Sequence, residues 1–204
     1  MKRSRLIGHR GFSLLELIVV VGLIGVVSAI AVPMFGNMLA NFRLSGDARG
    51  AANAVALAKM RASSIFTKVR VHVGVTSNAY YLETWDPTAL PAPGKWVAEG
   101  GTTALSQNVL FGYGVVGAAP AFTQGPIGQA PPCKNDAATS DISGSACVIF
   151  NSRGVPVDTT GAPTAVDAMY ITDGNAVYGI TISATGMIRT WRTLPLATPA
   201  WVQQ

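Results

Sequence analysis

Gly11-Phe12-Ser13-Leu14-Leu15-Glu16 is the stretch that decides the fold of this chain, because it places one carboxylate near the start of a long apolar run. From Phe12 to Phe35 the only polar side chains are Ser13, Glu16 and Ser28. At about 1.5 Å per residue, a helix of this length spans a bilayer core of roughly 30 Å. An ionised Glu in such a helix costs roughly 2.5–3.5 kcal/mol. Glu16 therefore needs a cationic partner, and a new amino terminus at Phe12 would supply one.

The ten residues before this stretch are strongly basic. They contain Lys2, Arg3, Arg5 and Arg10 and no acid. Such a charge bias holds a flanking segment on the cytoplasmic side of a membrane. We therefore expect the helix to point outward, with the rest of the chain beyond the membrane.

This junction resembles the signal of type IV prepilins, in which a short basic leader ending in Gly is followed by Phe, an aliphatic run and Glu. The resemblance implies that a prepilin peptidase cuts after Gly11 and N-methylates Phe12. It also implies that Glu16 pairs with the terminal amine of a neighbouring subunit. Pro33 matches a proline common in these subunits. The implied partners are the peptidase, other pilins or pseudopilins of the same filament, and an inner-membrane assembly platform.

An ordinary secretory signal peptide is the competing interpretation of the same residues. Ala29-Ile30-Ala31 offers a small-x-small cleavage site, which would make Val32 the first residue of a soluble protein. The apolar run before that site exceeds the usual 7–15 residues, and an early acid weakens such a signal. The prepilin interpretation is therefore favoured.

The net charge of the chain comes mainly from the basic leader. Fifteen basic and 10 acidic residues give +5, but removing the four basic leader residues leaves 11 against 10, or +1. Setting Glu16 aside in the membrane gives about +2 for the exposed part. A global basic field that attracts nucleic acid is not supported.

Helical spacing of apolar and small residues continues beyond the membrane-spanning part. The pattern includes Met38, Phe42, Ser45, Ala48, Ala52, Val55, Ala62 and Ile65. It predicts one helix from Phe12 to about Phe66, with a lipid-embedded first half and an amphipathic second half. Gly46 and Gly50 each cost about 1 kcal/mol relative to Ala, so the middle is the expected place for a bend or local melting.

After Lys68 the pattern changes to the alternation that is typical of β-strands. Strands are expected at 69–75, 79–84, 109–116, 147–151, 169–172, 176–183 and 187–192. Tight turns at 173–175 and 184–186 predict that the last three strands form an antiparallel meander. Residues 117–141 are rich in Gly, Pro, Ala and Gln and are expected to form a long exposed loop.

The carboxy-terminal region adds a second resemblance. The segment 148–156, the segment 178–186 and the strand that contains Arg189 resemble the end of the GspH/FimT family of minor pilins and pseudopilins. The family implies an α+β, pilin-like fold, with a long N-terminal helix packed on a β-rich antiparallel domain. It also implies a structural subunit near the tip of a type II secretion pseudopilus or a type IV pilus.

The two resemblances divide the chain into four expected segments. These are a leader peptide at 1–11, a transmembrane and polymerisation helix at 12–35, an amphipathic continuation at 36–66 and a β-rich globular domain at 67–204. The expected location is a bacterial inner membrane, crossed once, with the globular domain in the periplasm before incorporation in a filament.

The chain has two cysteines, Cys133 and Cys147. In an exported domain they are most simply a disulfide, which here closes a 15-residue loop worth about 3 kcal/mol. A metal site is less favoured, since no His lies near them in the sequence and two cysteines do not fill a zinc shell. We predict neither a metal nor a cofactor.

The sequence contains little that points to catalysis. Once the leader is removed, His72 is the sole histidine, and it lies mid-strand among valines. No G-x-S-x-G nucleophile elbow is present. Residues 112–117 fit G-x-G-x-x-G, but no helix pattern follows them. We therefore predict a non-enzymatic protein.

DNA binding is a second candidate function. Some members of the pilus branch of this family bind DNA through an arginine-containing turn near the carboxy terminus. The corresponding candidates are Arg189, Trp191 and Arg192, which combine phosphate contact with base stacking. However, Met187 replaces the basic residue expected after Gly186. A strand with Trp191 packed inward is therefore favoured over a nucleic-acid site.

Overall fold

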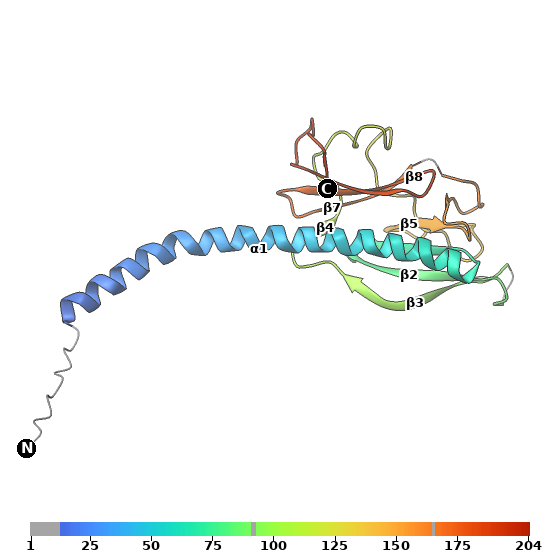
Figure 1. Cartoon of the computed structure of the whole chain (residues 1–204). Helices are drawn as coiled ribbons and strands as arrows, with labels where there is room; N and C mark the ends of the chain where they lie inside the picture. The colour runs from blue at the N-terminus through green and yellow to red at the C-terminus, as the bar shows by residue number, and fades with distance from the viewer. Residues whose placement is uncertain (1–12, 91–92, 165) are drawn as a thin grey trace, which may run out of the picture. The chain divides into compact units, whose positions relative to one another are not determined.

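The computed structural model describes residues 13–90, 93–164 and 166–204. The chain divides between Asn41 and Phe42 into two compact units. The first contains most of the apolar run, and the second contains the rest of the helix together with all described strands. The expected α+β class, with a long N-terminal helix and antiparallel sheets, is confirmed (Figure 1).

The helix α1 runs over Leu14–Ile65, 52 residues, close to the predicted span. Gly46 and Gly50 do not interrupt it, so the expected melting in the middle is not observed. The helix ends before Phe66, which has a positive φ of 54°. A residue in this left-handed conformation commonly terminates a helix.

Two five-stranded antiparallel sheets make up the second unit. The first has the order β3-β2-β1-β5-β6, from β1 (Val69–Gly74), β2 (Ala79–Asp86), β3 (Lys95–Ala104), β5 (Ser145–Phe150) and β6 (Pro156–Val157). The second has the order β10-β9-β8-β7-β4, from β4 (Leu110–Phe111), β7 (Val166–Thr172), β8 (Val177–Ser183), β9 (Ile188–Thr193) and β10 (Val202–Gln203). The predicted carboxy-terminal meander is therefore confirmed as β7-β8-β9.

The main core of the second unit lies between α1 and the inner faces of both sheets. A stripe of the helix at spacings of three and four is buried, namely Leu44, Ala48, Ala51, Val55, Ala58 and Ala62. The small alanines let the strands approach the helix closely. Valines of β1 and isoleucines of β8 complete this cluster. Ala48, Val55 and Ala62 of the predicted apolar face are buried in this core, but Met38 and Phe42 of the same predicted face are exposed.

The sequence prediction missed three strands and overestimated one. β3 was missed because it is an edge strand with mostly exposed side chains and a Gly100-Gly101 pair, so it shows no apolar alternation. β6 and β10 contain two residues each, too few for a pattern. The expected strand at 109–116 shortens to β4, since only two of its residues pair with β7.

The loop at 117–141 contains no strand, as predicted, but its second half is not simply exposed. Ala130 and Cys133 are buried. The Gln129 side chain donates to the carbonyl oxygen of Tyr170 (2.8 Å) and accepts from its N–H (2.9 Å). The Gln129 amide thus pairs with the backbone of β7 next to the short β4, and it holds the loop on the second sheet.

Lys59 joins two glycine turns of the carboxy-terminal motif to α1. Its Nζ donates to the Gly186 carbonyl oxygen at 2.8 Å. Gly154 and Gly186 both have positive φ, 70° and 73°. A Cβ on Gly186 would lie 2.5 Å from the Gly154 carbonyl oxygen. Glycine is required at Gly186 both by its conformation and by this close approach.

Candidate functional site

The start of α1 carries the first candidate residue, Glu16. Ser13 precedes the helix, and its Oγ accepts a hydrogen bond from the Glu16 N–H at 3.2 Å. Ser13 thus caps the helix, with Glu16 at the third helical position, which is the S-x-x-E pattern of a capping box. The Glu16 side chain is exposed at the positive end of the helix dipole. Gly11 and Phe12, the predicted cleavage and methylation residues, lie outside the described residues.

The helix in the first unit exposes almost all of its apolar surface. Large apolar side chains from Leu14 to Phe35 are 46–75% exposed. Soluble monomers rarely expose contiguous apolar patches of this extent. By length and composition, α1 is suited to cross a membrane. Lipid or neighbouring helices are the environments that match such a surface.

A cluster of three buried ionisable side chains lies on the outer face of the first sheet. Arg70 and His72 on β1 and Glu83 on β2 are 2, 9 and 8% exposed. Glu83 Oε2 accepts from Arg70 Nε at 2.6 Å and lies 3.0 Å from His72 Nδ1. Strand pairing explains the meeting, since Arg70 is directly opposite Glu83 in the β1–β2 register.

Aromatic rings enclose this cluster. The Arg70 guanidinium lies over the Trp96 ring at 4.2 Å, and His72 stacks on Tyr81 at 4.7 Å. Burial by itself raises the pKa of Glu83, but hydrogen bonds from His72 and Arg70 outweigh it and hold that pKa below its ordinary value. Glu83 is therefore a carboxylate at neutral pH, and it compensates the buried Arg70 charge.

The expected disulfide between Cys133 and Cys147 is confirmed, and it lies beside this cluster. Cys147 on β5 is the register partner of His72 on β1. One ring nitrogen of His72 and the two sulfur atoms all lie within 4.8 Å of one another. No histidine lies near the cysteines in the sequence, but the β1–β5 pairing brings His72 to them from a distant part of the chain.

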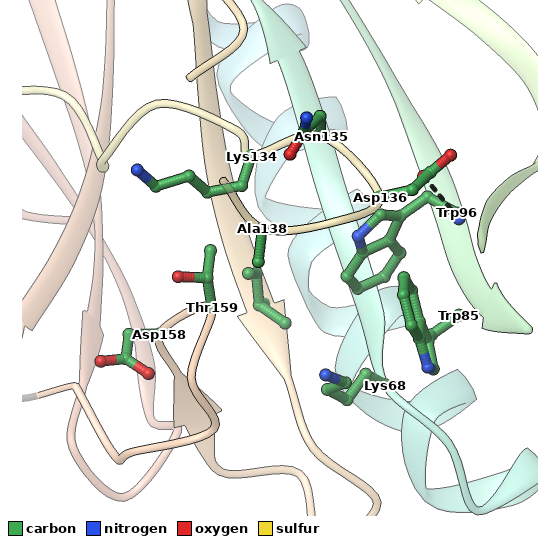
Figure 2. A pocket seen from close by; sticks show the side chains of 10 residues that line it. Lys68, Trp85, Trp96, Lys134, Asn135, Asp136, Ala138, Asp158 and Thr159 are labelled. Carbon is green, nitrogen blue, oxygen red and sulfur yellow. Dashed lines mark hydrogen bonds between the residues drawn. The ribbon is translucent and has the colours of Figure 1, made fainter. Parts of the chain in front are cut away.

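The loop that contains Cys133 is held over the outer face of the first sheet. Arg70 Nη1 donates to the Lys134 carbonyl oxygen at 2.8 Å, and the Asp136 carboxylate accepts from the backbone N–H of Trp96 at 3.0 Å. Figure 2 shows this second bond and the neighbouring Trp85 and Trp96 rings, whose centroids are 5.2 Å apart. The narrow pocket between loop and sheet is lined by rings and by charges of both signs. Cys133 and these hydrogen bonds together close the loop.

The candidate DNA-contact residues lie on β9. Arg189 is exposed, whereas Trp191 is half-buried and donates from Nε1 to Thr181 Oγ1 at 2.9 Å. Arg192 lies over the Tyr178 ring at 6.0 Å. Strand alternation places Arg189 and Trp191 on one face of the sheet and Arg192 on the other. The two arginines are therefore not brought together, and nucleic-acid contact stays a prediction.

Comparison with known families gives a match at the N-terminal segment. Residues 8–32 match the prokaryotic N-terminal methylation motif. The matched segment overlaps the start of α1, whose apolar side chains are exposed. Among solved structures, the minor pseudopilin EpsH from the type 2 secretion system of Vibrio cholerae is similar to this chain. The identity is 11% and the TM-score 0.45, over 72% of this chain and 95% of EpsH. No curated protein matches the chain significantly.

Sequence reasoning missed two features of these sites. The capping box was readable, since Ser13 precedes Glu16 by three residues immediately before the apolar run. The Arg70–His72–Glu83 cluster had a weaker signal, in the form of charged or polar residues at alternate positions of the predicted strand 69–75. Their burial depends on the loop that covers them, which periodicity alone does not reveal.

Proposed function

We propose that this chain is a minor pilin or pseudopilin, a non-enzymatic structural subunit. A prepilin peptidase processes it, and its N-terminal helix anchors it once in a bacterial inner membrane, with the globular unit in the periplasm. It then enters a type II secretion pseudopilus or a type IV pilus near the tip. The observation that carries this proposal is the N-terminal methylation motif, which stands on a helix with an exposed apolar surface.

Processing and assembly are linked through the start of α1. Cleavage after Gly11 creates a positive amine on Phe12, one residue before the helix cap at Ser13. Methylation of that amine retains its charge. An amine in this position on a neighbouring subunit is the cation that an ionised Glu16 needs in an apolar environment. The pairing fixes the relative height of two adjacent helices.

Helix packing supplies the remaining stabilisation of the filament. In the membrane, lipid covers the apolar side chains between Leu14 and Phe35. In a filament, the same side chains pack against neighbouring helices, so no apolar surface has to face water during transfer. Assembly proteins of the inner membrane would drive this lateral extraction. The Glu16–amine pair selects the register in which a subunit enters.

The structure provides a control that separates this pairing from simple helix capping. Glu16→Gln removes the charge, whereas Gln also suits the third position of a capping box. Ser13→Ala removes the cap acceptor and keeps the acid. We expect Glu16→Gln to be processed and to accumulate in the membrane unassembled, while Ser13→Ala still enters filaments, as measured in sheared filament fractions. Normal assembly of Glu16→Gln would refute the pairing.

The two alternative functions receive less support. DNA binding would draw on Arg189, Trp191 and Arg192, but the strand divides the two arginines between its faces. Secretion as a soluble domain after cleavage at Ala31 would discard most of the segment that matches the methylation motif. Each predicts a distinct outcome: measurable DNA affinity of the isolated protein, or a mature chain that begins at Val32.

A further inference from the structure

We propose that the reduced chain binds one zinc ion through His72, Cys133 and Cys147, in place of the disulfide. The inference is independent of filament assembly. It concerns the form of the protein whose cysteines are thiols, before oxidation or after reduction. Two thiolates and one imidazole are a set of ligands that zinc commonly uses in proteins.

The ligand atoms lie near the separations that a shared ion requires. The His72 ring nitrogen and both sulfur atoms lie within 4.8 Å of one another. Zn–S bonds of about 2.3 Å and Zn–N bonds of about 2.0–2.1 Å place tetrahedral ligand atoms roughly 3.3–3.8 Å apart. The sulfurs separate by this amount once their bond is broken. From the 4.8 Å limit, the longest separation between ligand atoms has to shorten by about 1 Å.

The charge of the surroundings suits the ion. Two thiolates neutralise Zn²⁺, and Arg70 and Glu83 already neutralise each other, so the metal adds no net charge to this buried region. An uncompensated charge at the same place would be costly. An anionic ligand at the same place would add a negative charge beside the Glu83 carboxylate, with no further positive charge to neutralise it.

Glu83 also supplies the outer support that a zinc-bound histidine normally has. Its Oε2 lies 3.0 Å from His72 Nδ1. A carboxylate on one ring nitrogen orients the imidazole and leaves the other nitrogen for the metal. The three protein ligands leave a fourth position for water. A cavity lined by Cys147, Pro132 and Asp167 borders the cysteine side of the site.

The chemistry requires an external reductant, a dithiol or a phosphine. A dithiol gives two electrons and its two protons, which breaks the Cys133–Cys147 bond into two thiols and converts the dithiol to a disulfide. A phosphine gives two electrons and becomes its oxide, and water supplies the oxygen of the oxide and the two thiol protons. Zinc then replaces the two thiol protons, which leave to solvent. The metal itself is neither oxidised nor reduced.

The test uses the full chain in detergent, reduced with a phosphine and then freed of the reductant. Zn²⁺ is titrated by calorimetry, and Co²⁺ is used as a spectroscopic probe of tetrahedral thiolate coordination. We expect one ion per reduced chain and none in the oxidised chain. Glu83→Gln should weaken binding by about 10–100-fold as a loss of outer support. His72→Gln should weaken it at least as much, while His9→Gln, at the other histidine, leaves it unchanged.

Circular dichroism and thiol titration keep the result interpretable if a variant or the reduced chain unfolds. A reduced wild-type chain with two free thiols and native circular dichroism that binds no zinc would overturn the proposal. Equal affinity of wild type and His72→Gln would also overturn it, because zinc would then be held by the cysteines alone. Binding by an unfolded reduced chain only, with no native signal restored by zinc, would count against a preformed site.

Discussion

Arg70, His72 and Glu83 lie on the outer face of the first sheet, but their polar side chains are buried. Removing one member of a buried ion pair is strongly destabilising, because the other charge is left without compensation. Here one carboxylate oxygen of Glu83 serves both Arg70 and His72. The guanidinium also holds the loop at Lys134. The cluster therefore links two strands of the first sheet to the disulfide loop.

The pKa of Glu83 predicts how the stability of the fold depends on pH. Because hydrogen bonds hold the folded-state pKa below the ordinary value of 4.5, the carboxylate stabilises the fold above pH 4.5. That contribution is lost as the pH falls through the folded-state pKa. We expect Glu83→Gln to cost roughly 3–5 kcal/mol at pH 7 and to flatten the pH dependence below 4.5. Urea unfolding of the full chain in detergent between pH 7 and pH 3 measures both effects.

Glu99 provides the matched control for this variant. It also pairs with an arginine, Arg61, at 2.6 Å, but both side chains are partly exposed. An exposed pair is worth about 1 kcal/mol or less. Glu99→Gln should therefore have a small effect at pH 7. If Glu83→Gln and Glu99→Gln lowered the free energy of unfolding equally, the buried Arg70–His72–Glu83 cluster would stabilise the fold no more than the exposed Arg61–Glu99 pair.

Single residues differ in how far the sequence reveals their setting. Glu16 was recognisable because an acid in an apolar run contradicts its surroundings, whatever the fold. His72 looked like an ordinary strand residue, and its contact with Glu83 and the cysteines depends on two strand pairings. Those pairings join segments far apart in the chain, so local pattern does not specify them.

Two glycines of α1, Gly46 and Gly50, have different surroundings. Gly46 has open space where a Cβ would lie, but a Cβ on Gly50 would be 2.9 Å from Tyr80 Oη. Tyr80 is buried and packs on Phe111, so its ring has little freedom to move. Gly50 thus accommodates a tyrosine of β2, whereas Gly46 has no such contact.

Alanine substitution separates these two glycines. Ala is favoured over Gly in a helix by about 1 kcal/mol, so Gly46→Ala should stabilise the chain by about that amount. Gly50→Ala should gain less or lose stability, because Tyr80 must shift. Urea unfolding of the two variants measures the difference. Equal stabilisation would show that Tyr80 does not require a glycine opposite it.

The turn between β8 and β9 carries a second matched comparison. Gly186 and Gly174 both have positive φ, 73° and 84°, but only a Cβ on Gly186 meets another backbone atom. Gly174→Ala should cost about 1–2 kcal/mol from its conformation. Gly186→Ala should cost roughly 1–3 kcal/mol more, because it also crowds Gly154. Similar losses in urea unfolding would contradict the stacking of the two turns on Lys59.

The elements themselves were predictable where burial imposes a period. The helix from Leu44 onward and the β7-β8-β9 meander have one face against the core, and their apolar patterns predicted both. β3 lies at the edge of its sheet with most side chains in solvent, so its residues carry no such period. The amphipathic stripe was partly misplaced, since apolar Met38 and Phe42 belong to the exposed surface and not to the core.

For the whole molecule, two kinds of surface divide the chain. The second unit buries an apolar core between α1 and two sheets, and the disulfide loop closes its outer side. The first unit leaves its apolar side chains exposed, and this surface matches an apolar environment such as lipid. The sequence places the end of the apolar segment at Phe35, whereas the two compact units divide between Asn41 and Phe42.

The position of the mature amino terminus shows directly whether a prepilin peptidase processes this chain. Intact mass and N-terminal sequencing are applied to the protein purified from membranes of cells that contain a prepilin peptidase. We predict a chain of 193 of the 204 residues that begins at Phe12 and carries one additional methyl group. A mature chain that begins at Val32, or one that retains the basic leader, would contradict cleavage after Gly11 by a prepilin peptidase.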